Sequence, residues 1–184
     1  SVTVCGSDVA SDPRGAQRNI GYLPEGAPGY DDMTVLEFLR FIAEIRGLKG
    51  EAKTKRLRQV IETVGLEDVL GKRIETLSKG FKRRVGLAQA IVHDPKVLIL
   101  DEPTDGLDPN QKHEVRSLIK KMARNKAIVL STHILEEVEA VCTRAIIIAH
   151  GKLLFDGTPA ELAERGPLDE VFRRITTGAQ PALS

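Results

Sequence analysis

The chain has 184 residues, of which 41% are hydrophobic and 29% are charged, and its net charge is +1. This length allows one sizeable core with room for a small subdomain. The balanced charge and the aromatic content of 4% argue against a nucleic-acid partner, because they provide neither a broad basic surface nor a base-stacking platform. The two widely separated cysteines form no CxxC pair, so we expect a reducing, cytosolic setting.

The first thirty residues predict short strands and a loop. The opening "SVTVCG" alternates valine with small or polar residues, as a half-buried strand does, and a second strand is expected at Ile20–Leu23. A loop rich in proline and glycine follows. Because the chain starts in a strand-like pattern without an initiator methionine, we expect a fragment of a longer chain or the loss of an upstream segment.

Two amphipathic helices are expected next. Thr34 and Glu37 have the spacing of a capping box, and apolar residues keep a helical period from there to Gly47. A second helix with the same kind of apolar face ends at Gly65, a residue type that is common just after helix C-termini.

The second half alternates apolar strands with helices. A helix over residues 81–92 precedes the strand "KVLILD", and Asp108 and Pro109 begin another helix. The strands "KAIVLSTH" and "RAIIIAH" flank the helix "ILEEVEAVC", and a strand in "HGKLLFDG", two short helices and a tail at 176–184 complete the chain. This alternation predicts an α/β fold whose mainly parallel sheet is covered on both faces.

Two adjacent carboxylates, Asp101 and Glu102, follow one of these strands. Ligands of parallel α/β sheets bind at the carboxyl ends of the strands. There, one carboxylate can hold Mg²⁺ through its water shell, and the second can orient and deprotonate the attacking water in phosphoryl transfer. His133 ends the next strand and could hydrogen-bond a γ-phosphate. The alternatives are an acid pair that only terminates a strand and a structural histidine.

A possible anion site opens the helix between these strands and the first half. Ser78 and Gly80 stand at its expected N-terminus, where a hydroxyl and free backbone N–H groups favour a bound anion. Taken alone, Ser78 is more commonly explained as an ordinary N-cap.

The order and spacing of these segments closely resemble the ATP-binding subunits of ABC transporters over essentially the whole chain. "LSKGF" at 77–81 resembles the signature motif, "LILDE" at 98–102 the Walker B motif, and "GLD" at 106–108 the D-loop. "STH" at 131–133 is similar to the switch-histidine segment, and "YLPEGAP" at 22–28 to the loop that senses the transport partner.

The resemblance implies a P-loop NTPase-like ABC ATPase core with a mainly parallel sheet and an α-helical subdomain. Four parts are expected: a remnant of the N-terminal β region with the sensing loop (1–28), the helical subdomain (29–76), the ATPase core (77–156), and C-terminal helices with a tail (157–184).

The same resemblance implies ATP and Mg²⁺ as cofactors and assigns the hydrolytic residues. Glu102 and His133 are expected to be catalytic, and Asp101 and Glu25 are expected to hold the metal. Glu25 is also expected to lie close to the bound nucleotide.

The signature and D-loop residues are expected to act on a second copy of the subunit. Ser78, Lys79 and Gly80 would contact ATP held by that copy in a head-to-tail dimer, and Asp108 would lie across the interface. The resemblance further implies a transmembrane permease as partner. The subunit would then be cytoplasmic and peripheral on the inner face of the cell membrane.

Substitutions in two of these motifs narrow the function. Lys79 and Phe81 replace a glycine and the glutamine of the usual LSGGQ signature, and Glu25 replaces the usual glutamine of the sensing loop. Both changes resemble those in the exporter branch of the ABC family, whose members handle drugs, polysaccharides, or gliding and copper-enzyme assembly factors. The expected function is therefore to power export.

A phosphate-binding loop of the form G-x-x-x-x-G-K-[ST] is missing from the sequence. The nearest segment, "GLEDVLGKR" at 65–73, has five residues between its glycines and ends in arginine, so we interpret it as a helix end and a basic turn. We expect the true loop and the first core strands upstream of Ser1, and the chain alone to be inactive.

Two other functions stay open. One is a soluble ABC-type ATPase of translation or repair, for which a second cassette, a coiled-coil insertion or a basic patch would be expected. The other is a non-catalytic interaction module or gene remnant. An in-frame phosphate loop just before Ser1 would favour the ATPase, and a start codon there would favour the module.

Overall fold

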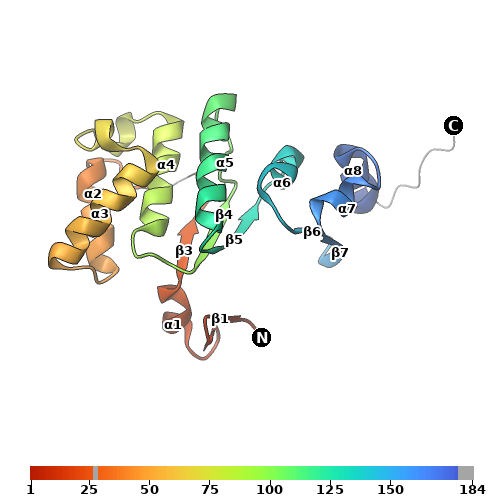
Figure 1. Cartoon of the computed structure of the whole chain (residues 1–184), viewed down its shortest axis with the longest axis horizontal. Helices are drawn as coiled ribbons and strands as arrows, with labels where there is room; N and C mark the ends of the chain where they lie inside the picture. The colour runs from red at the N-terminus through yellow and green to blue at the C-terminus, as the bar shows by residue number, and fades with distance from the viewer. Residues whose placement is uncertain (27–28, 178–184) are drawn as a thin grey trace. The chain divides into compact units, whose positions relative to one another are not determined.

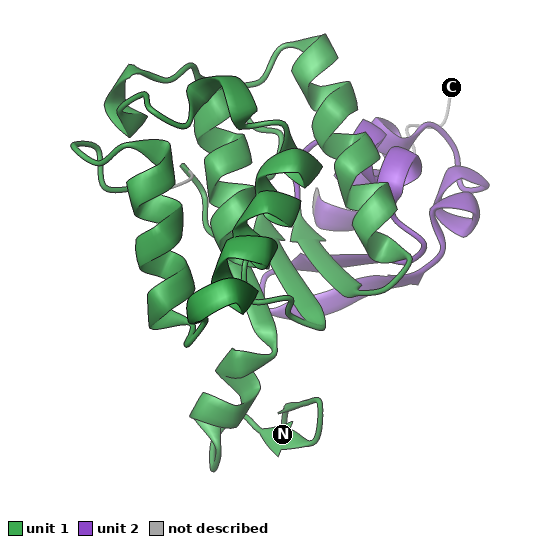
Figure 2. Cartoon of the chain, turned by 60° about the vertical axis from the view of Figure 1, so that its left-hand side comes forward, with its two compact units in different colours: residues 1–131 green, residues 132–184 purple. Residues whose placement is uncertain are grey.

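The computed structural model describes residues 1–26 and 29–177. The chain divides into two compact units, residues 1–131 and residues 132–184, which are coloured separately in Figure 2. Two segments of the expected organisation, residues 27–28 of the sensing loop and residues 178–184 of the tail, lie outside the described residues.

The first unit contains a short hairpin, three longer strands and the larger helices. In chain order these are β1 (Thr3–Val4), β2 (Ser7–Asp8), α1 (Pro13–Arg18), β3 (Ile20–Leu23), α2 (Val35–Ile45), α3 (Gly50–Val64), α4 (Lys79–Ile91), β4 (Val97–Asp101), α5 (Pro109–Ala123) and β5 (Ala127–Ser131), with two 3₁₀ turns at Glu67–Val69 and Ile74–Thr76.

The N-terminal region differs from the expected strand. Only Thr3–Val4 is extended, and it pairs antiparallel with Ser7–Asp8, because Cys5 and Gly6 turn the chain with φ values of 50° and 88°. Helix α1 was not predicted, although Asp12 caps it by accepting a hydrogen bond from the Gly15 N–H. An Asp-Pro helix start was therefore readable there.

The strands β3, β4 and β5 form a parallel sheet in that order. One face is covered over β3 and β4, where Leu23, Leu98 and Leu100 are 0% exposed, and is partly covered over β5, where Ile128 and Leu130 are half-buried. In Figure 1, helices α2, α3 and α4 lie beside one another next to β3. The predicted parallel α/β arrangement is confirmed on this face.

The opposite face of the same sheet is exposed. Tyr22, Ile99 and Val129 occupy matching positions on the three strands and are 48%, 37% and 61% exposed. The expected burial on both faces was therefore wrong for the described residues. A continuous apolar strand can be buried on both faces of a sheet. In this sheet, the described helices cover only the face that carries Leu98 and Leu100.

Local signals set the helix ends of the first unit. The Thr34 N–H donates to Glu37 Oε2 at 2.9 Å and the Glu37 N–H donates to Thr34 Oγ1 at 3.3 Å, which completes the predicted capping box of α2. Helix α3 ends at Gly65 with a φ of 66°. The interpretation of residues 65–73 as a helix end and turn is confirmed.

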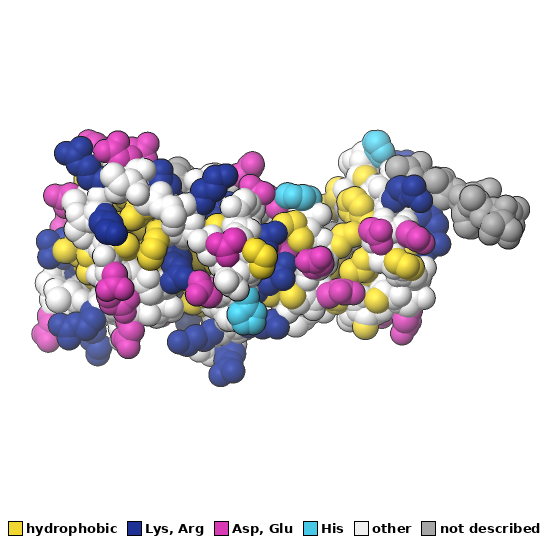
Figure 3. All heavy atoms as spheres, turned by 90° about the horizontal axis from the view of Figure 1, so that it is seen from above, with side chains coloured by type: hydrophobic (Ala, Val, Ile, Leu, Met, Phe, Trp, Pro, Cys, Tyr) yellow, Lys and Arg dark blue, Asp and Glu magenta, His cyan; other side chains and the backbone are white. Residues whose placement is uncertain are grey.

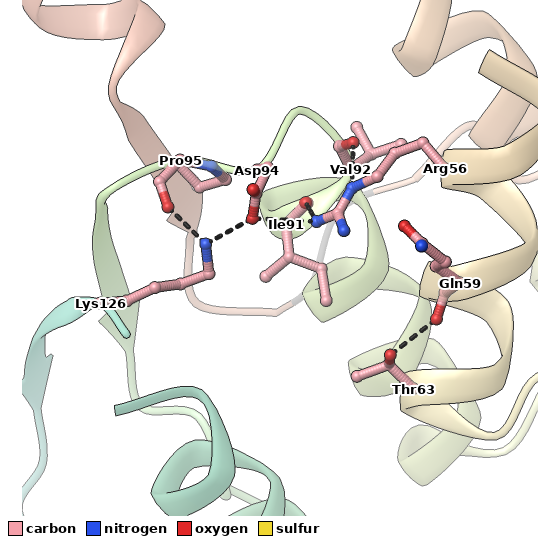
Figure 4. A network of polar contacts seen from close by, with 8 residues as sticks. All are labelled: Arg56, Gln59, Thr63, Ile91, Val92, Asp94, Pro95 and Lys126. Atoms are coloured by element: carbon pink, nitrogen blue, oxygen red, sulfur yellow. Dashed lines mark hydrogen bonds and ion pairs between the residues drawn. The ribbon is translucent and has the colours of Figure 1, made fainter. Parts of the chain in front are cut away.

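A polar network joins α3 to the end of α4 (Figure 4). Arg56 donates to the Ile91 carbonyl oxygen at 2.7 Å and to the Val92 carbonyl oxygen at 3.0 Å. The carboxylate of Asp94 accepts from Arg56 at 3.4 Å and from Lys126 at 2.7 Å. One carboxylate thus connects the helix α3 with the residue that precedes β5.

The second unit is built on an antiparallel hairpin. Strands β6 (Ala145–Ala149) and β7 (Lys152–Gly157) pair around a turn in which His150 and Gly151 have φ values of 51° and 70°. Helices α6 (Leu135–Val141), α7 (Pro159–Ala163) and α8 (Leu168–Thr177) complete it. Its core residues are Ala145, Ile147, Phe155, Leu162 and Val171.

Candidate functional site

Asp101 ends β4 and pairs in register with Ser131, the last residue of β5. The Ser131 hydroxyl donates a hydrogen bond to Asp101 Oδ1. The two strand ends therefore fix one carboxylate oxygen and leave the second oxygen to other partners. A carboxylate held in this way at the carboxyl end of a parallel sheet is well placed for a ligand.

Glu102 has an unusual backbone conformation. Its φ is 45°, in the left-handed region that residues other than glycine rarely adopt. Two backbone bonds hold it there: its N–H donates to the Ser131 carbonyl oxygen, and its carbonyl oxygen accepts from the Asp105 N–H, both at 3.1 Å. Strain of this kind gathers at functional sites.

The signature segment forms the start of α4. Ser78 is exposed, and its hydroxyl accepts from the Phe81 N–H at 3.4 Å, so it is the N-cap. Gly80 is buried, and a Cβ there would lie 2.6 Å from Gln111 Nε2. Glycine at this position therefore permits the close approach of α5.

The D-loop lies against the signature segment of the same chain. Gly106 has a φ of 67°, and a Cβ built on it would be 3.3 Å from Lys79 Nζ. Asp108 caps α5 as predicted, because its carboxylate accepts from the Gln111 N–H at 3.0 Å. Lys79 and Asp108 both remain exposed at this surface.

Two further predicted residues lie at other strand ends. Glu25 is exposed and follows β3, which is the neighbour of β4 in the sheet. His133 follows β5, is exposed and belongs to the second unit. The structure thus gathers the acids, the signature segment and the D-loop within the first unit.

The described residues do not form a metal site by themselves. Among residues 1–26 and 29–177, no group of three or more His, Cys, Asp or Glu side chains is arranged to hold a metal ion. Mg²⁺ commonly uses one or two carboxylates together with nucleotide phosphates. Asp101 and Glu25 carry the hard oxygen donors that this pattern uses, and nucleotide phosphates would have to supply further ligands.

Sequence reasoning missed Arg83. This residue of α4 is only 5% exposed, and its guanidinium donates to the Pro24 carbonyl oxygen at 3.4 Å. Burial lowers the pKa of Arg83, while the negative charge of nearby acids, Asp105 first, acts to raise it. In the sequence it stands in the basic run "KRR", whose most common role is a solvated helix face.

Among the described residues, the surface hollow that we find does not contain the predicted site residues. A hollow of about 420 Å³ lies between α3, α4 and α5 and is lined in part by Gly65, Arg84 and Glu114, but by none of the predicted site residues. Acidic and basic side chains are mixed over the face drawn in Figure 3. No helix of the described part is long and apolar enough to cross a membrane.

A family model described as ABC transporter matches residues 1–105, and a model described as an AAA domain matches residues 73–139. The uncharacterized ABC transporter ATP-binding protein YxlF of Bacillus subtilis is 39% identical over 149 residues, which are 81% of this chain and 50% of that protein. The Nod factor export ATP-binding protein I of Burkholderia pseudomallei is 39% identical over 168 residues, covering 89% of this chain and 54% of its own length.

Solved structures agree with these matches. An ATP-binding subunit of an ABC transporter superposes with a TM-score of 0.81 at 29% identity, over 95% of this chain and 75% of that chain. Clostridium perfringens cbiO1, part of the ABC transporter complex cbiONQ, gives 0.75 at 28% identity, over 88% of this chain and 64% of its own. The chain spans about half the length of the curated relatives it matches.

Proposed function

Because the chain belongs to the ATP-binding subunits of ABC transporters, we propose that it forms the hydrolytic part of a subunit that powers export across a membrane. The observation that carries this proposal is the acid pair at the end of β4: Asp101 is fixed by Ser131, and Glu102 is turned by its positive φ.

The two acids have different roles in this proposal. Asp101, with Glu25 from the neighbouring strand end, would hold Mg²⁺, which shields the charge that develops on the phosphates. Glu102 orients the attacking water and accepts its proton. His133 donates a hydrogen bond to the γ-phosphate.

A second copy completes the site. Ser78 and Gly80 stand at the N-terminus of α4, where backbone N–H groups and the helix dipole favour phosphate oxygens. Together with Lys79 they contact the nucleotide of the partner copy, and Asp108 lies at the dimer interface. The close packing of Gln111 against Gly80 fixes the start of α4 relative to α5 and leaves Ser78 and Lys79 exposed for this contact.

The transport partner is proposed to be a transmembrane permease that docks on the helical subdomain at residues 29–76. The other divisions, 1–28, 77–156 and 157–184, then serve as sensing region, ATPase core and C-terminal region. The subunit would be cytoplasmic and held at the inner face of the cell membrane by the permease. Export as the direction is supported by the Nod factor export relative.

The chain by itself is proposed to bind ATP weakly and to lack measurable turnover. The reason is that no G-x-x-x-x-G-K-[ST] segment occurs in the 184 residues, and such a loop supplies the N–H groups and the lysine that cradle phosphates. Calorimetric titration of the purified chain with Mg-ATP tests this point, and tight binding would show it to be wrong.

The hydrolytic assignment is tested with Glu102→Gln in the longest reading frame that contains this sequence. We expect a loss of steady-state ATPase activity of about 10² to 10⁴-fold, with retained nucleotide binding. Glu51→Gln, the same change on the exposed first turn of α3, is the matched control and should leave the rate unaltered. Normal turnover by Glu102→Gln would contradict the assignment.

A further inference from the structure

Arg83 is the one buried basic side chain among the residues that the structure describes. Removing a guanidinium from water is costly unless charges and hydrogen bonds compensate for it. Its neighbours on α4 behave differently: Lys82 and Arg84 are partly exposed, and Arg84 pairs with Glu114 on α5. The burial is thus particular to the face of α4 that carries Arg83.

Four acids and one carbonyl offset part of this cost, and burial remains the larger effect because the pKa of Arg83 is lowered overall. The carboxylates of Asp105, Glu25, Asp101 and Glu102 all favour the charged guanidinium. Its Nη1 also donates to the carbonyl oxygen of Pro24, at 3.4 Å, immediately before Glu25. Arg83 therefore reaches from the signature helix to the carbonyl immediately before Glu25, and its charge interacts favourably with the acids that follow β3 and β4.

We propose that Arg83 is a positioning residue that acts as the internal counter-ion of these carboxylates and ties α4 to the sensing loop. The inference rests on the proposed function, since that function gives Asp101 and Glu102 their roles. It adds that the Arg83 guanidinium and a bound divalent cation compete for the same carboxylates, because both are positively charged and repel each other.

Manganese binding to the purified 184-residue chain, followed by electron paramagnetic resonance, tests this competition. Arg83→Gln removes the positive charge and should tighten Mn²⁺ binding by about five- to tenfold. Arg83→Lys keeps the charge and should bind as the parent does. Lys82→Gln removes a charge one residue away, and because that ammonium is partly exposed and screened, it should also behave as the parent.

A purely structural role for Arg83 predicts the opposite sign. Loss of a packing residue would loosen the acids and weaken Mn²⁺ binding. Binding by folded Arg83→Gln that is unchanged from the parent chain or weaker would therefore overturn the proposal.

A double-mutant cycle keeps the test decisive if Arg83→Gln is poorly folded. Asp105, the acid with the largest effect on Arg83, lies outside the proposed metal and catalytic residues. Adding Asp105→Asn to Arg83→Gln removes the excess negative charge and should recover about half of the lost urea midpoint. Lys82→Gln combined with Asp105→Asn should show no coupling. Purely additive losses in both pairs would contradict a counter-ion role.

Both measurements use the chain without nucleotide. A normal ATPase rate in Glu102→Gln would overturn the proposed function without altering either result. Conversely, unchanged Mn²⁺ affinity in Arg83→Gln would overturn only the role of Arg83.

Discussion

The two faces of the β3-β4-β5 sheet carry the same kind of residue and meet different environments. Leu98 and Leu100 on one face are fully buried, whereas Ile99 and Val129 on the other are 37% and 61% exposed. The strand sequence does not distinguish them, because alternate residues of an apolar strand point to opposite sides. The comparison shows that burial in this sheet is decided by the helices packed on it.

The largest expected effect comes from opening a cavity in the covered face. Leu100→Ala should lower the free energy of unfolding by about 3 kcal/mol, through lost apolar burial and the cavity left behind. Urea denaturation of the purified chain measures it. A loss below about 1 kcal/mol would mean that the helices collapse onto the gap.

The next effect depends on pH and on a histidine where α4 meets β3. His93 donates from Nε2 to the Ile20 carbonyl oxygen at 3.0 Å, and burial, with Arg46 nearby, lowers its pKa from 6.5 to about 4. The folded state therefore binds this proton less readily than the unfolded state. The stability contribution is complete above pH 6.5 and is lost as the pH falls toward 4, by roughly 2 kcal/mol, which is below the full linkage value because solvent reaches part of the half-buried ring.

Urea midpoints measured between pH 7 and pH 4 provide the check. His93→Gln cannot gain this proton and should show a shallower decline than the parent chain. Parallel declines of the two proteins would remove His93 as the cause.

A smaller effect is expected at the start of α2, outside the sheet. Thr34→Ala removes the hydroxyl that accepts from the Glu37 N–H, so the helix loses an N-cap worth about 1 kcal/mol. Thr34→Ser keeps the oxygen and serves as the control in the same urea experiment. Equal losses in both variants would locate the effect in the threonine methyl group instead.

The smallest effect sharpens the comparison on the exposed face. Ile99→Thr should change the free energy of unfolding by less than about 1 kcal/mol, although Ile99 lies between Leu98 and Leu100. It should also reduce self-association in sedimentation experiments, since it removes exposed apolar area. A destabilisation as large as that of Leu100→Ala would show that this face is covered in solution.

Local chemistry made several parts of the fold predictable. The capping box at Thr34, the glycine at 65 and the Asp-Pro start at Asp108 are written in adjacent residues, and all three set helix ends as expected. The strand at Ile20–Leu23 was also located correctly. These features need only short-range contacts, which a sequence displays directly.

Parts that depend on distant contacts were not predictable. Arg83 stands beside two other basic residues, and only the packing of α4 against the Pro24 carbonyl shows that it is buried. The positive φ of Glu102 likewise follows from bonds to Ser131 and Asp105, one of them far along the chain. The sequence therefore identified Asp101 and Glu102, but not the hydrogen bonds that hold them in place.

The network around Asp94 has a mechanical consequence for α4. This helix of 13 residues is about 20 Å long. Arg56 of α3 donates hydrogen bonds to carbonyl groups at the C-terminal end of α4, and Arg83 in the first half of α4 donates to the Pro24 carbonyl oxygen. Helix α4 is therefore held by hydrogen bonds near both of its ends. We expect a tilt of α3 that preserves the Arg56 bonds to move α4 as a whole, and with it the contact of Arg83 beside the acids.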